Sequence, residues 1–171
     1  MKMLKNLLAL VVASYLWTST LAQAAPLTIT LDTPFQTVSS AGGDLLTFYA
    51  TVTNIDPGST VYLNGDSANL YGPGLALDDT GFWTNAPLAL APGASSGRFE
   101  LFAVSVPADT AAGLYAGSFS IMGGGAADYG TVGTANFNIS VTPVPEPSSV
   151  LLWSVGLLFV LCVHGRRARR G

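Results

Sequence analysis

Hydrophobic and polar residues alternate along most of the chain between residues 27 and 142, as they do in half-buried β-strands. Apolar side chains stand at every second position in several segments, including 27–31, 46–52, 117–121 and 135–141. No segment of this region keeps a helical period for ten residues. About seven short strands in about 115 residues are typical of a two-sheet sandwich. The pattern therefore predicts an all-β fold.

Turn signals divide these strands and predict two local irregularities. Asn64-Gly65 is a strong hairpin signal, and residues 65–80, rich in Gly, Asp and Pro, are expected to form a long loop or an irregular edge. The apolar positions change phase between Leu101 and Phe102, which predicts a β-bulge.

The stretch from Leu90 to Tyr115 resembles bacterial immunoglobulin-like domains. It has a Pro-Gly turn at 92–93, a strand that ends in Val106-Pro107, and a Gly-x-Tyr corner that ends at Tyr115. The resemblance implies an immunoglobulin-like sandwich. It places Asp109 and Tyr115 where a tyrosine corner has its turn acid and its ring. Simple core packing of Tyr115 is the alternative.

The first 24 residues have the three parts of a secretory signal peptide. Lys2 and Lys5 precede an apolar core that begins at Leu7, and Ala22 and Ala24 are small residues at the two positions that a signal peptidase reads. We expect cleavage after Ala24, with Ala25 as the second choice. An uncleaved N-terminal anchor is the alternative, although the apolar core is short.

Residues 148–164 form a predicted transmembrane helix. The sixteen apolar or small residues at 148–163 extend about 24 Å as a helix, slightly less than the ~30 Å hydrocarbon core of a bilayer. A basic tail at 165–171 follows, and it argues against a buried core helix. The positive-inside rule places this tail in the cytoplasm and residues 25–143 on the other side of the membrane. The arginines that would stop transfer are Arg166, Arg167, Arg169 and Arg170.

The four residues before this helix, with the helix and the arginines, resemble the PEP-CTERM sorting tail of exported proteins of Gram-negative bacteria. The motif is Val144, Pro145, Glu146 and Pro147. The resemblance covers residues 144–171 and implies that an exosortase-type membrane peptidase is a partner, together with the general secretion machinery. The two prolines hold the backbone extended, and Glu146 marks the peptide just outside the membrane. A plain linker before a permanent anchor is the alternative.

Charge and composition exclude several classes of function. The chain has 171 residues, 10% of them charged, and residues 25–143 carry nine acids against one arginine, a formal charge of −8. Such a surface repels nucleic acid. The only cysteine and the only histidine, Cys162 and His164, lie in the C-terminal tail. The central region therefore offers no Cys or His zinc site and no histidine-activated nucleophile. We expect a protein that is not an enzyme and has no cofactor.

Two groups of central residues could bind a ligand. Asp78 and Asp79, with Asp66, Asn64 and Asn69, offer oxygen ligands for calcium without EF-hand spacing, and solvated loop acids are the simpler interpretation. Aromatic rings near the expected loop form a candidate sugar-binding surface, or they plug the ends of the sandwich. These are Tyr62, Tyr71, Phe82 and Trp83.

Two hypotheses of function follow from these features. In the first, the protein is exported, anchored in the inner membrane with its domain in the periplasm, and released by processing to the cell surface or extracellular matrix. There its domain is a structural or adhesion module. In the second, the domain is a carbohydrate-binding module for an extracellular polysaccharide. We favour the first.

Overall fold

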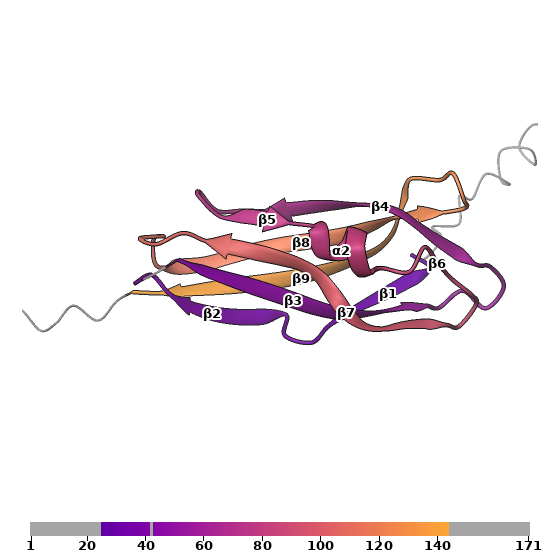
Figure 1. Cartoon of the computed structure of the whole chain (residues 1–171), viewed down its shortest axis with the longest axis horizontal. Helices are drawn as coiled ribbons and strands as arrows, with labels where there is room; N and C mark the ends of the chain where they lie inside the picture. The colour runs from indigo at the N-terminus through magenta and orange to yellow at the C-terminus, as the bar shows by residue number, and fades with distance from the viewer. Residues whose placement is uncertain (1–24, 42, 144–171) are drawn as a thin grey trace, which may run out of the picture.

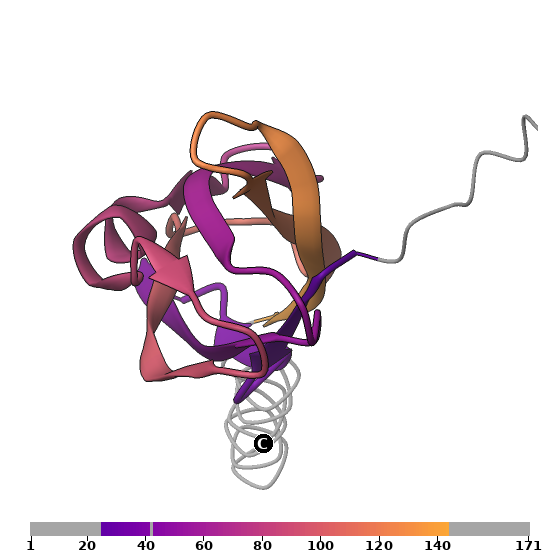
Figure 2. The same cartoon turned by 90° about the vertical axis from the view of Figure 1, so that its right-hand side faces the viewer.

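The computed structural model describes residues 25–41 and 43–143 as two β-sheets packed face to face. A short helix, α2 (Thr80–Asn85), interrupts the strands. The strands are β1 (Leu27–Leu31), β2 (Phe35–Ser39), β3 (Asp44–Asn54), β4 (Val61–Leu70), β5 (Ala76–Asp78), β6 (Ala89–Leu90), β7 (Ser95–Val106), β8 (Gly113–Gly124) and β9 (Gly130–Thr142). The predicted all-β sandwich is confirmed. Seen along the long axis, the two sheets enclose the core, and α2 lies at one side of the sandwich (Figure 2).

The order of the strands matches the immunoglobulin arrangement. One sheet has the order β1-β3-β7-β5, and the other has the order β2-β9-β8-β4-β6. In constant-type immunoglobulin domains strands A, B, E and D form one sheet, and strands C, F and G form the other. Here β1, β3, β7 and β5 take the places of A, B, E and D, while β4, β8 and β9 take those of C, F and G. Two strands are additional: β2 pairs with β9 in parallel, and β6 pairs with β4 in the antiparallel sense.

The core between the sheets is built on four phenylalanines from four different strands. Phe48, Phe102, Phe119 and Phe137 have no exposed surface. Phe102 lies at the centre, with its ring centroid 4.7 Å from Phe48, 5.0 Å from Phe119 and 4.8 Å from Phe137. Gly117 makes room for this cluster, because a Cβ there would lie 2.3 Å from the Phe137 ring. The inward positions predicted from the alternation in β3, β8 and β9 are therefore confirmed.

Among the described residues one polar side chain, that of Asn54, is fully buried, and its hydrogen bonds join the β3–β4 loop to the end of β6 and the loop that follows it. Asn54 Nδ2 donates to the carbonyl oxygens of Ser59, Leu90 and Ala91 at 2.8, 3.0 and 3.1 Å. Its Oδ1 accepts the Asp56 N–H at 3.0 Å. Every polar atom of the side chain therefore has a partner in place of water, as burial requires.

The tyrosine corner and the β-bulge are both confirmed. The Tyr115 hydroxyl donates to the Ala111 carbonyl oxygen at 2.7 Å, which is the backward bond of a tyrosine corner. Asp109 occupies the preceding turn with φ 63°, a left-handed conformation that Asp tolerates better than most residues. On β7 the register moves from Phe48↔Phe102 to Tyr49↔Glu100, so Leu101 is the extra residue. The predicted change of phase lies at this point.

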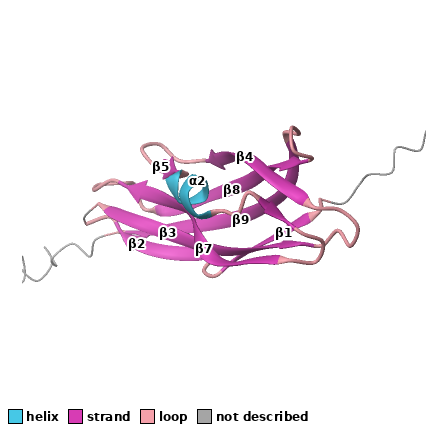
Figure 3. Cartoon of the chain, turned by 45° about the vertical axis from the view of Figure 1, so that its right-hand side comes forward, coloured by secondary structure: helices cyan, strands magenta, loops and turns pink. Residues whose placement is uncertain are grey.

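The hairpin predicted at Asn64-Gly65 is wrong. These two residues lie inside β4, which continues to Leu70. Of the two alternatives for 65–80, a long loop is wrong, because the segment contains the last six residues of β4, the short edge strand β5 and the start of α2. In Figure 3, α2 is the cyan element beside β5 and β7. A six-residue helix is too short to produce a recognisable helical period.

The predicted signal peptide at 1–24, the sorting motif at 144–147, the transmembrane helix at 148–164 and the basic tail at 165–171 all lie outside the described residues. Within residues 25–41 and 43–143, no helix has the length and hydropathy needed to cross a membrane.

Candidate functional site

The four predicted aromatic residues do not form one surface. Tyr62 lies near the start of β4 and Tyr71 directly follows its last residue, so the two are about 30 Å apart at 3.3 Å per residue. Phe82 is only 2% exposed, so its place in a ligand surface is wrong. Trp83 is 60% exposed. Of the four residues, Trp83 is the one around which the structure builds a site.

The helix α2 holds Trp83 outward because its neighbour points into the core. Phe82 packs on Phe119 with ring centroids 6.0 Å apart. Gly81 allows the helix to approach β7 closely, because a Cβ there would lie 2.8 Å from Glu100 Cγ. Consecutive helical residues point about 100° apart. With Phe82 buried, Trp83 therefore faces the solvent beside β4.

A β-bulge in β4 brings a second aromatic residue to the same place. The register passes from Leu63↔Gly123 to Gly65↔Met122, which leaves Asn64 as the extra residue. Asn64 Nδ2 donates to the carbonyl oxygens of Gly125 and Asp128, both at 2.8 Å. These two bonds hold the turn between β8 and β9. They therefore also hold Tyr129, which follows Asp128.

Trp83 and Tyr129 converge on Gly65. A Cβ at Gly65 would lie 4.0 Å from Trp83 Cη2 and 3.9 Å from Tyr129 Cδ1. Both rings are largely exposed, Trp83 at 60% and Tyr129 at 65%. Sequence reasoning missed Tyr129. Its one signal is a single tyrosine within the glycine-rich stretch 123–130.

Two carboxylates lie next to Trp83. Asp79 immediately precedes α2 but makes no side-chain cap. The Asp78 carboxylate accepts from the Thr80 N–H at 2.9 Å and from the Thr80 hydroxyl at 2.5 Å. The Asp79 carboxylate accepts the Trp83 indole N–H at 3.3 Å instead. The second acid, Asp66, follows Gly65 on β4.

The surroundings of Asp66 disfavour its ionised form. Burial raises the pKa of Asp66 to about 6, the negative charge of Asp79 adds to the rise, and the Trp83 side chain offsets part of it. Repulsion between like charges in a partly dehydrated place has this effect. Trp83, Tyr129, Asp66 and Asp79 are called the aromatic–acidic cluster below.

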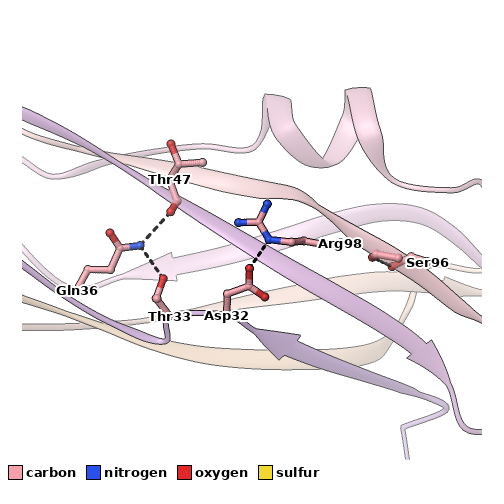
Figure 4. A network of polar contacts seen from close by, with 7 residues as sticks. Asp32, Thr33, Gln36, Thr47, Ser96 and Arg98 are labelled. Carbon is pink, nitrogen blue, oxygen red and sulfur yellow. Dashed lines mark hydrogen bonds and ion pairs between the residues drawn. The ribbon is translucent and has the colours of Figure 1, made fainter.

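No basic side chain of the described residues is available to neutralise this cluster. Arg98 is the only Lys or Arg between residues 25 and 143. Its Nε donates to Asp32, and its guanidinium lies 3.9 Å above the Tyr49 ring. Figure 4 shows Arg98 and Asp32 facing each other, near the Gln36 contacts with Thr33 and Thr47. This network lies where the chain passes from β1 in one sheet to β2 in the other.

The residues considered for calcium are dispersed among other contacts. Asp78 is bound to Thr80, and Asn64 holds the turn at 125–128. Among the residues that the structure describes, no group of three or more His, Cys, Asp or Glu side chains could hold a metal ion.

No family model and no curated protein matches the sequence. Two solved structures match this chain over about 70% of its length at low sequence identity. One is native alpha-2-macroglobulin from Escherichia coli, in the segment from domain MG7 to the C-terminus, at 19% identity and a TM-score of 0.43, over 70% of this chain and 17% of that one. The other is a non-cellulosomal cohesin from Archaeoglobus fulgidus, at 16% identity and a TM-score of 0.27, over 69% of this chain and 92% of that one. The strand order itself carries the fold assignment.

Proposed function

We propose that this chain is an exported protein of the cell envelope or extracellular matrix, delivered by its C-terminal sorting tail. In this proposal the sandwich is a structural or adhesion module without catalytic activity. The observation that carries the proposal is the position of the folded domain between the two predicted targeting segments. The Pro26 carbonyl oxygen already accepts the Ile55 N–H at 2.8 Å, two residues after the expected cleavage at Ala24. The last strand ends at Thr142, two residues before Val144.

The position of the chain ends supports a tethered module. Residues 25 and 143 lie at opposite ends of the long axis (Figure 1). A tail attached after residue 143 therefore leaves the turn between β8 and β9 at the far end from the membrane. That turn carries Tyr129 and reaches the aromatic–acidic cluster. A module anchored at one end and presenting contacts at the other suits adhesion.

The test is the mass of the intact protein recovered from cells that make an exosortase. We expect a mature form that starts at residue 25 and lacks residues 148–171. Glu146→Ala should leave full-length protein in the inner membrane, because the motif can no longer be cut. Ser149→Ala, just outside the motif, is the control and should be processed normally. Surface-exposed protein that still carries residues 148–171 would overturn the sorting proposal.

Deleting residues 166–170 tests the anchor separately. Moving each arginine through hydrocarbon costs about 2.5–3.5 kcal/mol on insertion scales, so the arginines should stop translocation. Without them the tail should pass through the membrane and leave uncut protein in the periplasm. Unchanged membrane retention of the deleted form would contradict the proposed topology.

Carbohydrate binding is the second candidate function, and one observation favours it. Trp83 and Tyr129 are two exposed rings that both lie close to Gly65, a residue without a side chain. Flat aromatic faces of this kind stack well on the apolar faces of sugar rings.

A further inference from the structure

The aromatic–acidic cluster combines exposed aromatic rings with carboxylates. The Trp83 and Tyr129 rings both approach Gly65, and the Asp79 carboxylate accepts the Trp83 indole N–H at 3.3 Å. Arg98, the one cation of residues 25–143, is engaged with Asp32 and Tyr49. A ligand that brings a positive charge would also favour the ionised form of Asp66, whose pKa is raised by burial and by the charge of Asp79.

We propose that this cluster binds an amino sugar of a cationic polysaccharide. The apolar face of the pyranose ring lies against Trp83 and Tyr129 above Gly65. The protonated amine of the sugar lies between the carboxylates of Asp79 and Asp66.

The aromatic pair accounts for the sugar ring. Gly65 has no side chain. The Trp83 and Tyr129 rings are the side chains nearest to it, within 4.0 Å of where a Cβ would lie. Asn64 fixes Tyr129 in place through two hydrogen bonds to the turn. A site whose rings are held before the ligand arrives loses less conformational entropy on binding.

Charge accounts for the amine. Residues 25–143 carry a formal charge of −8, which attracts a cationic polymer and repels an acidic one. The indole face adds a cation–π attraction of about 0.5–2 kcal/mol, depending on desolvation. A lysine or arginine side chain of a peptide would pair with the carboxylates and would need only one aromatic face. A pyranose ring can contact both Trp83 and Tyr129, so the presence of two rings favours the sugar.

This inference rests on the proposed function in one respect, because export is what brings the protein to an extracellular polysaccharide. Binding is measured on the purified full chain in detergent micelles, so its failure is distinct from a failure of tail processing. The probe is a glucosamine oligosaccharide with its amines protonated. The same oligosaccharide with its amines acetylated is the matched probe without the charge. Calorimetry measures the affinity of each.

We expect the acetylated oligosaccharide to bind about tenfold more weakly, since a tenfold change corresponds to about 1.4 kcal/mol. Trp83→Ala should abolish binding, and Tyr129→Ala should weaken it. Asp79→Asn should remove the preference for the free amine, so that the two oligosaccharides bind this variant with equal affinity. Tyr71→Ala is the matched control, because this ring is 75% exposed at the other end of β4.

Each other outcome overturns a stated part of the inference. Equal affinity for the two oligosaccharides would show stacking without charge recognition and refute the role of the acids. Stronger binding of an oligolysine peptide than of the amino sugar would refute the polysaccharide as partner. No binding of either sugar, by a protein whose thermal unfolding is normal, would refute the site. Trp83→Phe keeps an aromatic face and should retain part of the affinity, which separates loss of stacking from loss of folding.

Discussion

The phenylalanine core and the β4–α2 edge are built by different rules. In the core, four rings from β3, β7, β8 and β9 pack between two sheets with ring centroids 4.7–5.0 Å apart along contacting pairs. At the edge, one bulge, one six-residue helix and one turn bring Trp83 and Tyr129 together in the solvent. The core depends on apolar burial, and the edge depends on a few directed hydrogen bonds.

This difference separates stability from recognition. Removing a core ring forfeits burial and leaves a cavity, whereas removing an exposed ring changes little in the free protein. The edge can therefore carry an unfavourable pair of carboxylates without threatening the fold. Substitutions in the two regions should show this separation, with large effects on unfolding in one and on binding in the other.

Phe102→Ala should have the largest effect on stability. Phe102 has no exposed surface and contacts three other rings of the cluster. We expect the free energy of unfolding to fall by about 3–5 kcal/mol, from lost burial and the cavity left behind. Chemical denaturation followed by circular dichroism measures this change.

The control for Phe102→Ala is Trp83→Ala, which removes a ring of similar size from the edge. We expect a loss below about 1 kcal/mol there, because Trp83 is 60% exposed. Equal losses at the two positions would contradict the separation between core and edge.

Asn54→Ala should have the second largest effect. It leaves the carbonyl oxygens of Ser59, Leu90 and Ala91 without their donor, and each buried unsatisfied group costs about 1–3 kcal/mol. Relaxation and water entry reduce the sum, and we expect a loss of about 2–3 kcal/mol in the free energy of unfolding. Asn136→Ala, at an exposed position of β9, is the control. A loss no larger than that of the control would show that the Asn54 bonds contribute nothing.

The core could be predicted from the sequence, and the edge could not, for a physical reason. Period-2 alternation predicts the inward positions Phe48, Phe119 and Phe137, and the phase change predicts the bulge at Leu101. The alternation shows which side chains of a strand face the other sheet, and in a sandwich these side chains make up nearly the whole core. The tyrosine corner at Tyr115 is equally predictable from the sequence, because its hydrogen bond spans only four residues.

The edge depends on contacts between residues far apart in the chain. Asn64-Gly65 has the composition of a hairpin turn, but Asn64 instead donates to a turn 61 and 64 residues later. No local pattern records that partner, so the hairpin was predicted and Tyr129 was missed. Phe82 was assigned to a surface because a six-residue helix hides which of two adjacent rings points inward.

Asn64→Ala should separate binding from stability most sharply. It removes two hydrogen bonds at an exposed position, and we expect a loss of about 1 kcal/mol in the free energy of unfolding. The turn at 125–128 then loses its hold, Tyr129 moves away from Gly65, and the affinity for the glucosamine oligosaccharide should fall as it does in Tyr129→Ala. Asn69→Ala, an exposed position on the same strand, is the control. Unchanged affinity would mean that the bulge does not position Tyr129.

The smallest expected effect is the pH dependence that Asp66 adds to folding. Its pKa is about 6 in the folded protein against the ordinary value of 3.8 for an aspartate, so the folded state binds the proton more tightly. Stability from this group is therefore greatest below pH 3.8, falls as pH rises, and reaches its lowest level above pH 6.

Asp66→Asn resembles the protonated acid at every pH. We expect this variant to be more stable than the original protein at pH 7 by less than about 1 kcal/mol, because water screens a partly exposed side chain. The difference should vanish near pH 4, as denaturant unfolding at a series of pH values would show. Asp44→Asn, at an exposed position on β3, controls for the overall change in charge. A gain in stability that is the same at all pH values would mean that the ionised form of Asp66 is not what its surroundings disfavour.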